Sequence, residues 1–227
     1  MSLKNKTISG LFWTFSQQFS VQLINFIVQI ILARILIPAE FGLIAMLTVF
    51  IAIGNSLMDN GMTSSLIRTK NPDHEDYSTV FFINLGVSIL VYIILFFSAP
   101  TIGDFYNQPI LTPVVRVYSL SFFITAFVGV QTTRLTKDMR FKVQMAMQVP
   151  SVVMGGIVGI ILAYLGYGVW SLVWMNLTQS FLFTIQHWIF SGWYPSFMIN
   201  KEKLIYHFKF GYKLTIAGLL NAIFDNA

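Results

Sequence analysis

Four uncharged amide side chains near the N-terminus have the type and spacing to do chemistry together. They stand at intervals of four, three and four residues inside an apolar run: Gln18, Gln22, Asn25 and Gln29. In a helix this spacing places all four on one face. An amide both donates and accepts hydrogen bonds, and one left without a partner in hydrocarbon costs about 1–3 kcal/mol. The stripe therefore predicts contact with water, with a polar solute or with a neighbouring helix.

This stripe of amides has two interpretations. Hydrogen bonds between packed helices would satisfy the amides and hold a bundle together. Alternatively, the stripe lines a water-filled cavity through which a polar solute passes. Four long amides on one face are more than packing needs, so we favour the cavity.

Asn55 and Asp59 stand one helical turn apart at the end of the second apolar run. Asn55 extends the predicted cavity wall. Asp59 is a candidate for coupling transport to an ion or a proton, because carboxylates inside a membrane span are rare and functional. The sequence Asp59-Asn60-Gly61 is equally typical of a helix end, since glycine is favoured just past the last turn.

Arg34 follows the first apolar run and is the other charged candidate. One interpretation is structural: its long side chain reaches the lipid headgroups or pairs with Glu40. The other is functional: it faces the cavity and holds a phosphate, which guanidinium groups bind well.

The elements that must position these residues are apolar runs of about 17–24 residues, close to the ~20 helical residues that cross a hydrocarbon core. In chain order they are Leu11–Ala33, Phe41–Leu57, Thr79–Ala99, Pro113–Thr133, Val143–Leu165 and Tyr167–Phe190. A seventh run begins near Phe210. The pattern predicts an all-α, polytopic transmembrane helix bundle with six complete spans and the start of a seventh.

Basic residues fix the predicted orientation of this bundle. With alternating spans, 12 of the 14 Lys and Arg residues fall on one side: Lys4, Lys6, Arg68, Lys70, Arg134, Lys137, Arg140, Lys142, Lys201, Lys203, Lys209 and Lys213. The other side holds only Arg34 and Arg116. Because loops rich in Lys and Arg stay in the cytoplasm, we expect the N-terminus to be cytoplasmic.

Composition argues against several other classes of protein. Apolar residues make up 56% of the chain and charged residues 10%, against about 25% in soluble domains. The net charge of +5 is confined to predicted inner loops, which indicates topology and contact with anionic lipid rather than with nucleic acid. The chain has no cysteine, its three histidines lack metal-ligand spacing, and it contains no catalytic grouping. We therefore predict no metal, no cofactor and no enzymatic activity.

The fifth apolar run carries a row of small residues. Ser151, Gly155 and Gly159 are spaced four apart. Such a row lets the backbone of another helix come close.

The longest inner connection suggests how the chain is organised. We predict a six-helix lobe over residues 1–190, a cytoplasmic or interfacial linker over 191–209, and the start of a second lobe over 210–227. The chain stops part-way through the seventh run, so we expect a natural truncation or a fragment of a protein about twice as long. Similar openings of the first and seventh runs, Thr7–Phe12 and Thr215–Leu220, favour a protein of two related halves.

Several stretches resemble bacterial polysaccharide flippases, in the polysaccharide-transport branch of the multidrug/oligosaccharidyl-lipid/polysaccharide exporter superfamily. They are Leu32–Gly42, Asp59–Gly61, Ser64–Arg68, Arg140–Lys142 and Gly166–Val173. The resemblance runs over nearly the whole chain and matches about the first half of a family member.

The resemblance implies two six-helix lobes around a central cleft that opens alternately to each side. The expected cargo is an oligosaccharide on undecaprenyl diphosphate, turned from the cytoplasmic to the outer face of the plasma membrane for O-antigen, capsule or exopolysaccharide synthesis. Arg34 is the residue at a family motif position that could hold the diphosphate. The expected partners are the bilayer, the lipid-linked oligosaccharide, and the polymerase and glycosyltransferase machinery.

Two other functions fit parts of the pattern. A small-molecule or drug cation antiporter of the same superfamily would need more acidic residues within the spans, where only Asp59 stands. A truncated bundle that does not transport, and serves as an assembly partner, would explain the early end of the chain. A membrane-embedded glycosyl- or acyltransferase would need a catalytic histidine or a carboxylate pair at a membrane face.

Overall fold

Every regular element in the computed structural model, which describes residues 3–58 and 61–226, is an α-helix. In chain order the helices are α1 (Leu3–Ile35), α2 (Pro38–Met58), α3 (Met62–Arg68), α4 (His74–Phe105), α5 (Leu111–Tyr118), α6 (Leu120–Ala126), α7 (Gly129–Lys137), α8 (Phe141–Tyr164), α9 (Val169–Phe190) and α10 (Lys201–Asn226). The predicted all-α fold is confirmed.

Within the described part of the chain, four helices are long and apolar enough to cross a membrane. They are Ser9–Ile35 within α1, then α2, α4 and α8. The segments Leu111–Ala126 and Gly129–Lys137 form a possible fifth span that is bent by 43°. The 22 residues of α9 are long enough, but Asn176, Gln179 and His187 make this helix more polar. The membrane helix bundle is confirmed, and the count of six complete spans stays a prediction.

The fourth predicted span is broken into α5, α6 and α7 rather than formed by one helix. Two threonine hydroxyls bond within this region: Thr125 Oγ1 donates to Ser121 O at 2.8 Å, and Thr133 Oγ1 donates to Gly129 O at 2.8 Å. Such bonds compete with the helical ladder and bend helices. They favour a bend in a span that the apolar run alone predicts to be straight, although the same bond from Ser151 Oγ to Met147 O leaves α8 unbroken.

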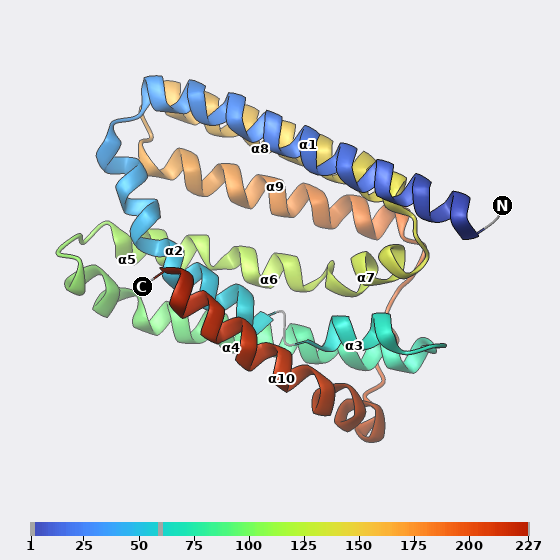
Figure 1. Cartoon of the computed structure of the whole chain (residues 1–227). Helices are drawn as coiled ribbons and strands as arrows, with labels where there is room; N and C mark the ends of the chain where they lie inside the picture. Colours follow the sequence, from blue (N-terminus) through green and yellow to red (C-terminus); the bar gives the residue numbers. More distant parts are fainter. Residues whose placement is uncertain (1–2, 59–60, 227) are drawn as a thin grey trace.

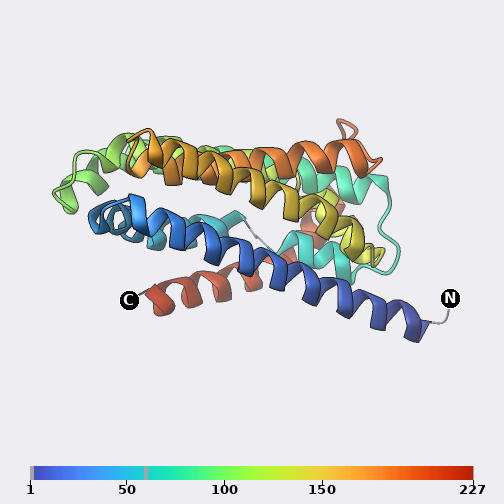
Figure 2. The same ribbon diagram turned by 90° about the horizontal axis from the view of Figure 1, so that it is seen from above.

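The connections alternate between two ends of the bundle (Figure 1). The N-terminal end of α1, α3, the α7–α8 turn and the beginning of α10 lie at one end, which we call the basic end because most Lys and Arg residues belong to these segments. The α1–α2, α4–α5 and α8–α9 connections lie at the opposite end. Seen from above, α1 and α10 lie on one side of the molecule, and α8 and α9 on the other (Figure 2).

Small residues bring α8 close to its two neighbours. A Cβ at Gly155 would lie 2.8 Å from Met175 O of α9, and one at Gly159 would lie 2.9 Å from the Met175 side chain. On the other side, Gly156 makes room for Val28 of α1. The close approach predicted from the row of small residues is confirmed, with α9 as the partner.

The last helix, α10, packs on α2, α3 and α4. A side chain at Gly61 would collide with α10, because its Cβ would lie 2.5 Å from Gly211 O. Gly61 also has a positive φ of 65°, which glycine adopts without strain. Since α10 begins at Lys201, the boundary predicted at residue 210 falls within one continuous helix. The division into two lobes stays a prediction.

Candidate functional site

The amides of α1 differ in what surrounds them. Gln17 belongs to the seam with α8, where its Nε2 donates to Gln148 Oε1 at 2.7 Å. The next residue, Gln18, is exposed, and so is Gln22 one turn later. These two line an open hollow of about 500 Å³ together with Phe15, Phe19 and Val21. We call it the α1 hollow.

The other two residues of the stripe continue along α1 beyond this hollow. Gln29 is exposed and Asn25 is half-buried. Neither residue lines the α1 hollow itself. The structure therefore leaves most of the predicted stripe open rather than buried against α8.

Asn55 lines a second hollow, of about 410 Å³, which we call the polar pocket. Five helices contribute to it, and its lining is Asn55, Met58, Thr63, Asn84, Thr125, Ala126, Gly129, Thr132 and Thr133. The polar pocket and the α1 hollow share no lining residue. The structure thus places Gln22 and Asn55 in two separate hollows. Asp59, the candidate for ion coupling, lies outside the described residues.

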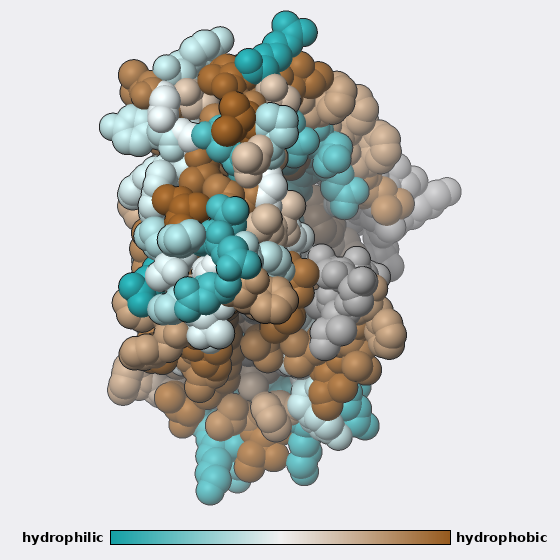
Figure 3. Space-filling model, turned by 90° about the vertical axis from the view of Figure 1, so that its left-hand side faces the viewer, coloured by the Kyte–Doolittle hydropathy of each residue, from teal (hydrophilic) through white to brown (hydrophobic). Residues whose placement is uncertain are grey.

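Arg34 is exposed near the end of α1. Its predicted partner, Glu40, is used elsewhere: Glu40 Oε2 accepts a hydrogen bond from the Ile37 amide at 3.0 Å, and Oε1 lies against Gly168. Figure 3 looks at this end of the bundle, where hydrophilic residues gather over the middle and hydrophobic residues predominate below them. The Arg34 guanidinium is therefore available to headgroups or to an anionic ligand.

At the basic end, a buried histidine joins α10 to α3 and α4. His207 is fully buried, with its Nδ1 2.8 Å from Ser65 Oγ and its Nε2 3.2 Å from Asp76 Oδ1. Burial lowers the pKa of His207, and the hydrogen bond with Asp76 opposes that shift. The neutral imidazole can then donate to the carboxylate and accept from the hydroxyl. The sequence does not reveal these contacts of His207, because its partners are more than a hundred residues away along the chain.

Lys203 adds further contacts between α10 and the start of α4. Its Nζ contacts Asp73, and it lies 3.4 Å from Glu75 Oε2 and 3.6 Å from Asp76 Oδ2. The hydrogen bond from Lys203 lowers the pKa of Asp73 to about 2. Asp73 and Asp76 also form a capping box at the start of α4. Together His207 and Lys203 fasten α10 to the beginning of α4.

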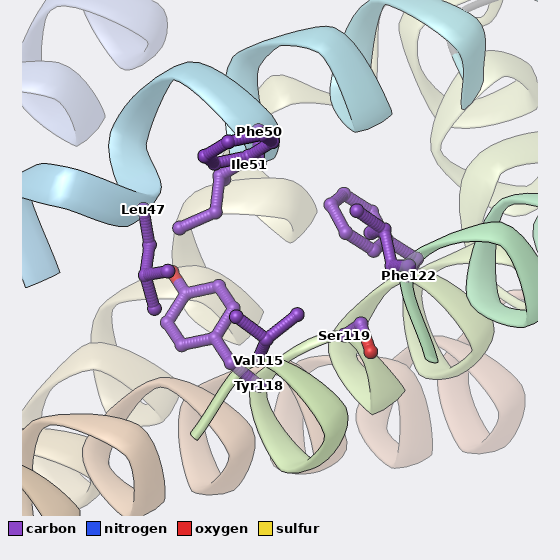
Figure 4. Close-up of a pocket in the computed structure, with 8 residues that line it drawn as sticks. Leu47, Phe50, Ile51, Val115, Tyr118, Ser119 and Phe122 are labelled. Atoms are coloured by element: carbon purple, nitrogen blue, oxygen red, sulfur yellow. The ribbon is translucent and has the colours of Figure 1, made fainter. Parts of the chain in front are cut away.

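A third hollow is a gap in apolar packing rather than a binding site. It lies between α2, α4 and α5–α6 and holds only about 10 Å³, roughly the space of one water molecule. Figure 4 shows the Tyr118 ring pointing toward Leu47 across this gap, with Val115 and Phe122 beside it. Among residues 3–58 and 61–226, no three His, Asp or Glu side chains come together as a metal ion would need.

Comparisons with known proteins place the chain in a family. A model of the family described as "polysaccharide biosynthesis protein" matches residues 31–227. The chain belongs to this family. The resemblance to polysaccharide flippases found in the sequence is thereby confirmed, and this family member is a multi-pass membrane protein.

Three curated relatives show how far the similarity extends. The chain is 34% identical to the lipopolysaccharide biosynthesis protein WzxC of Escherichia coli over 124 residues, which cover 55% of the chain and 25% of WzxC. It is 24% identical to the succinoglycan biosynthesis transport protein ExoT of Rhizobium meliloti over 88% of the chain and 40% of ExoT. It is 24% identical to the teichuronic acid biosynthesis protein TuaB of Bacillus subtilis over 99% of the chain and 47% of TuaB.

The chain spans less than half the length of each of these relatives. No solved structure matches it.

Proposed function

We propose that this chain forms the first lobe, residues 1–190, and the beginning of the second lobe of a transporter. Its cargo is an oligosaccharide linked to undecaprenyl diphosphate, which it turns from the cytoplasmic to the outer face of the bacterial plasma membrane by alternating access. The N-terminus and the basic end face the cytoplasm. The exported glycan serves polysaccharide synthesis, and polymerase and glycosyltransferase machinery act before and after transport.

The observation that carries this proposal is the open amide stripe on α1. Gln18 and Gln22 line the α1 hollow, whereas Gln17 is satisfied by Gln148 in the seam with α8. A polar side chain that faces hydrocarbon without a partner is costly, so the exposed amides need water, a polar solute or another helix, and we propose water and solute. Saccharide hydroxyls both donate and accept, which matches the chemistry of amides. The names of the relatives, which refer to polysaccharide synthesis and to transport, support the same function.

Each part of the cargo needs a different surface. The sugars require a hydrated path with hydrogen-bonding walls, and the lipid tail stays in the bilayer. The diphosphate requires positive charge in a region of low dielectric constant, and Arg34 provides it at the outer end of α1. Asp59 provides the coupling of transport to an ion. No bond is made or broken in this process, so the proposed function is transport rather than catalysis.

The described acidic side chains argue against a drug cation antiporter. Glu40, Asp73, Glu75, Asp76, Asp104, Asp138 and Glu202 all lie in the first or last turn of a helix or just beyond it. An antiporter that binds cations within the membrane needs carboxylates along the middle of its spans. The stripe on α1 offers only neutral amides.

The test replaces Gln22 and Asn25 together by Leu in the natural gene. We expect glycan export to fall at least about tenfold, because two hydrogen-bonding groups are worth about 1 kcal/mol each and about 1.4 kcal/mol is a factor of ten. Surface glycan and accumulated lipid-linked precursor are measured, with the amount of protein in the membrane as reference.

The matched control removes two amides from the seam between α1 and α8. Replacing both Gln17 and Gln148 by Leu takes away both partners of one hydrogen bond, which is close to neutral when the shape is kept. Export by this control should stay near the wild-type level. Normal export by the Gln22→Leu/Asn25→Leu variant would overturn the proposed function.

A further inference from the structure

We propose that the polar pocket between α2, α3, α4, α6 and α7 is a binding subsite for a neutral sugar unit of the cargo, and that it selects which glycan is accepted. This inference rests on the proposed function and adds a specificity site that is separate from the stripe on α1. Its volume of about 410 Å³ lies within the ~300–1,000 Å³ that small-molecule sites usually have.

The described lining of the polar pocket is hydrogen-bonding and uncharged. Two amides and four hydroxyls come from Asn55, Asn84, Thr63, Thr125, Thr132 and Thr133, and the other lining residues are Met58, Ala126 and Gly129. Because these described residues include no cationic side chain, they do not suit a diphosphate. Because they include no carboxylate, they do not suit a dehydrated metal cation. Neutral donors and acceptors beside a few apolar groups suit the hydroxyls and the C–H faces of a sugar.

The side-chain hydroxyl of Thr132 is the clearest indication that the pocket binds a ligand. Its hydroxyl oxygen is buried and has no hydrogen-bond partner within the described part of the chain. The Thr132 carbonyl is already bonded, since it accepts from Gln144 Nε2 at 3.1 Å. A buried hydroxyl without a partner costs free energy, and a rotation about χ1 of Thr132 that turns the hydroxyl towards a ligand hydroxyl in the pocket would remove that cost.

The neighbouring threonines complement Thr132. Thr125 Oγ1 donates to Ser121 O, and Thr133 Oγ1 donates to Gly129 O, both at 2.8 Å. Each of these hydroxyls has therefore used its proton within its own helix and keeps its lone pairs as acceptors. The pocket thus offers fixed acceptors next to one unpartnered hydroxyl, a pattern that can distinguish sugars by the positions of their hydroxyls.

Gly129 keeps this space open. A Cβ at Gly129 would meet only Asn84 Nδ2, at the ordinary contact distance of 3.8 Å, and Asn84 itself is 3% exposed. Alanine should therefore fit at position 129, whereas a larger side chain would extend into the pocket. Position 129 allows the pocket to be filled without removing any polar group.

The experiment compares two pairs of variants in the natural gene. Thr132→Val removes the unpartnered hydroxyl and Thr132→Ser keeps it; Gly129→Leu fills the pocket and Gly129→Ala leaves it open. Each is tested with the complete lipid-linked glycan and with a lipid carrier that bears one sugar, which is made in cells lacking the later glycosyltransferases. The amount of each protein in the membrane is measured alongside.

We expect Thr132→Val and Gly129→Leu to lower export of the complete glycan about tenfold, and to leave export of the single-sugar carrier unchanged. Thr132→Ser and Gly129→Ala should behave as wild type. Wild-type export of the complete glycan by both Thr132→Val and Gly129→Leu would overturn the subsite. An equal loss with both substrates would overturn it too, because the pocket would then serve only folding. In either case a loss of export in Gln22→Leu/Asn25→Leu would leave the proposed function standing.

Discussion

At the level of single side chains, two neighbouring glutamines of α1 have opposite roles. Gln17 bonds to Gln148 and helps to hold α1 on α8, while Gln18 opens into the α1 hollow. Adjacent residues of a helix point about 100° apart. Gln17 therefore faces α8, whereas Gln18, the next residue, faces outward. The proposed path for the cargo depends on this difference in direction and not on residue type.

The exposed side chain of Arg34 leads to a prediction about a single residue. Replacing it by Ala should lower glycan export about tenfold, because charge-assisted hydrogen bonds to phosphate are worth ~1.5–3 kcal/mol. Replacing Arg34 by Lys keeps the positive charge and should lower glycan export much less than the Ala variant does. Export of surface glycan is the measurement, and wild-type export by both variants would show that Arg34 only reaches the headgroups.

The candidate site is predictable from the sequence only where it lies within one helix. The stripe on α1 repeats at helical spacing, so the sequence reveals it. The polar pocket draws its residues from separate helices, and Asn84 is a single amide within an apolar run. His207 likewise meets Ser65 and Asp76 only after folding. Patterns along the chain do not reveal contacts that the packing of distant helices creates.

At the level of helices, the packing of α10 on α2 is the contact most closely connected with the proposed movement. Gly218 of α10 lies against Ser56 of α2, so that a Cβ at Gly218 would be 3.8 Å from Ser56 Cβ. Disulfides join residues whose Cβ atoms are about 3.5–4.5 Å apart. The chain has no cysteine of its own, so a pair introduced here has no competing thiol.

Replacing Ser56 and Gly218 together by Cys should therefore give an intramolecular disulfide under mild oxidation. If the proposed second lobe moves against the first, the bond should hold one state and stop most glycan export, and a reductant should restore it. Mass spectrometry detects the bond, and the two single-cysteine variants are the controls. A disulfide that forms fully and leaves export unchanged would show that α2 and α10 move together.

Helix boundaries were partly predictable from the apolar runs. The runs identify α1, α2, α4 and α8 well, because long apolar stretches have few alternatives in a membrane protein. The runs miss the break of the fourth span, where two threonine hydroxyls bond to carbonyls of their own helices. They also predict that the last helix begins near Phe210, whereas α10 begins at Lys201. Lys201 and Lys203 are polar, yet α10 begins there, because Asn200 Oδ1 accepts hydrogen bonds from the Glu202 and Lys203 amides and caps the helix.

For the whole molecule, the distribution of charge and the open amide stripe lead to the same account. Most basic residues belong to the segments at one end of the bundle, which the sequence predicts to be cytoplasmic (Figure 1). From that end the stripe runs along α1 towards Arg34, beside the seam with α8. The account requires water along this stripe, since the cargo's sugars cannot cross hydrocarbon unsolvated.

Thiol labelling of single cysteines on α1 tests this requirement most directly. Variants at the four stripe positions, 18, 22, 25 and 29, are compared with Leu23→Cys and Phe26→Cys, whose native side chains are 47% and 61% exposed and do not line the α1 hollow. The exposed area of a side chain does not distinguish the two sets, because it does not tell contact with lipid from contact with water. We predict that a water-soluble thiol reagent labels the stripe positions and leaves positions 23 and 26, which we expect to face lipid, unlabelled. Four stripe positions that stay unlabelled in every state of the transport cycle, or that react no faster than positions 23 and 26, would contradict the account.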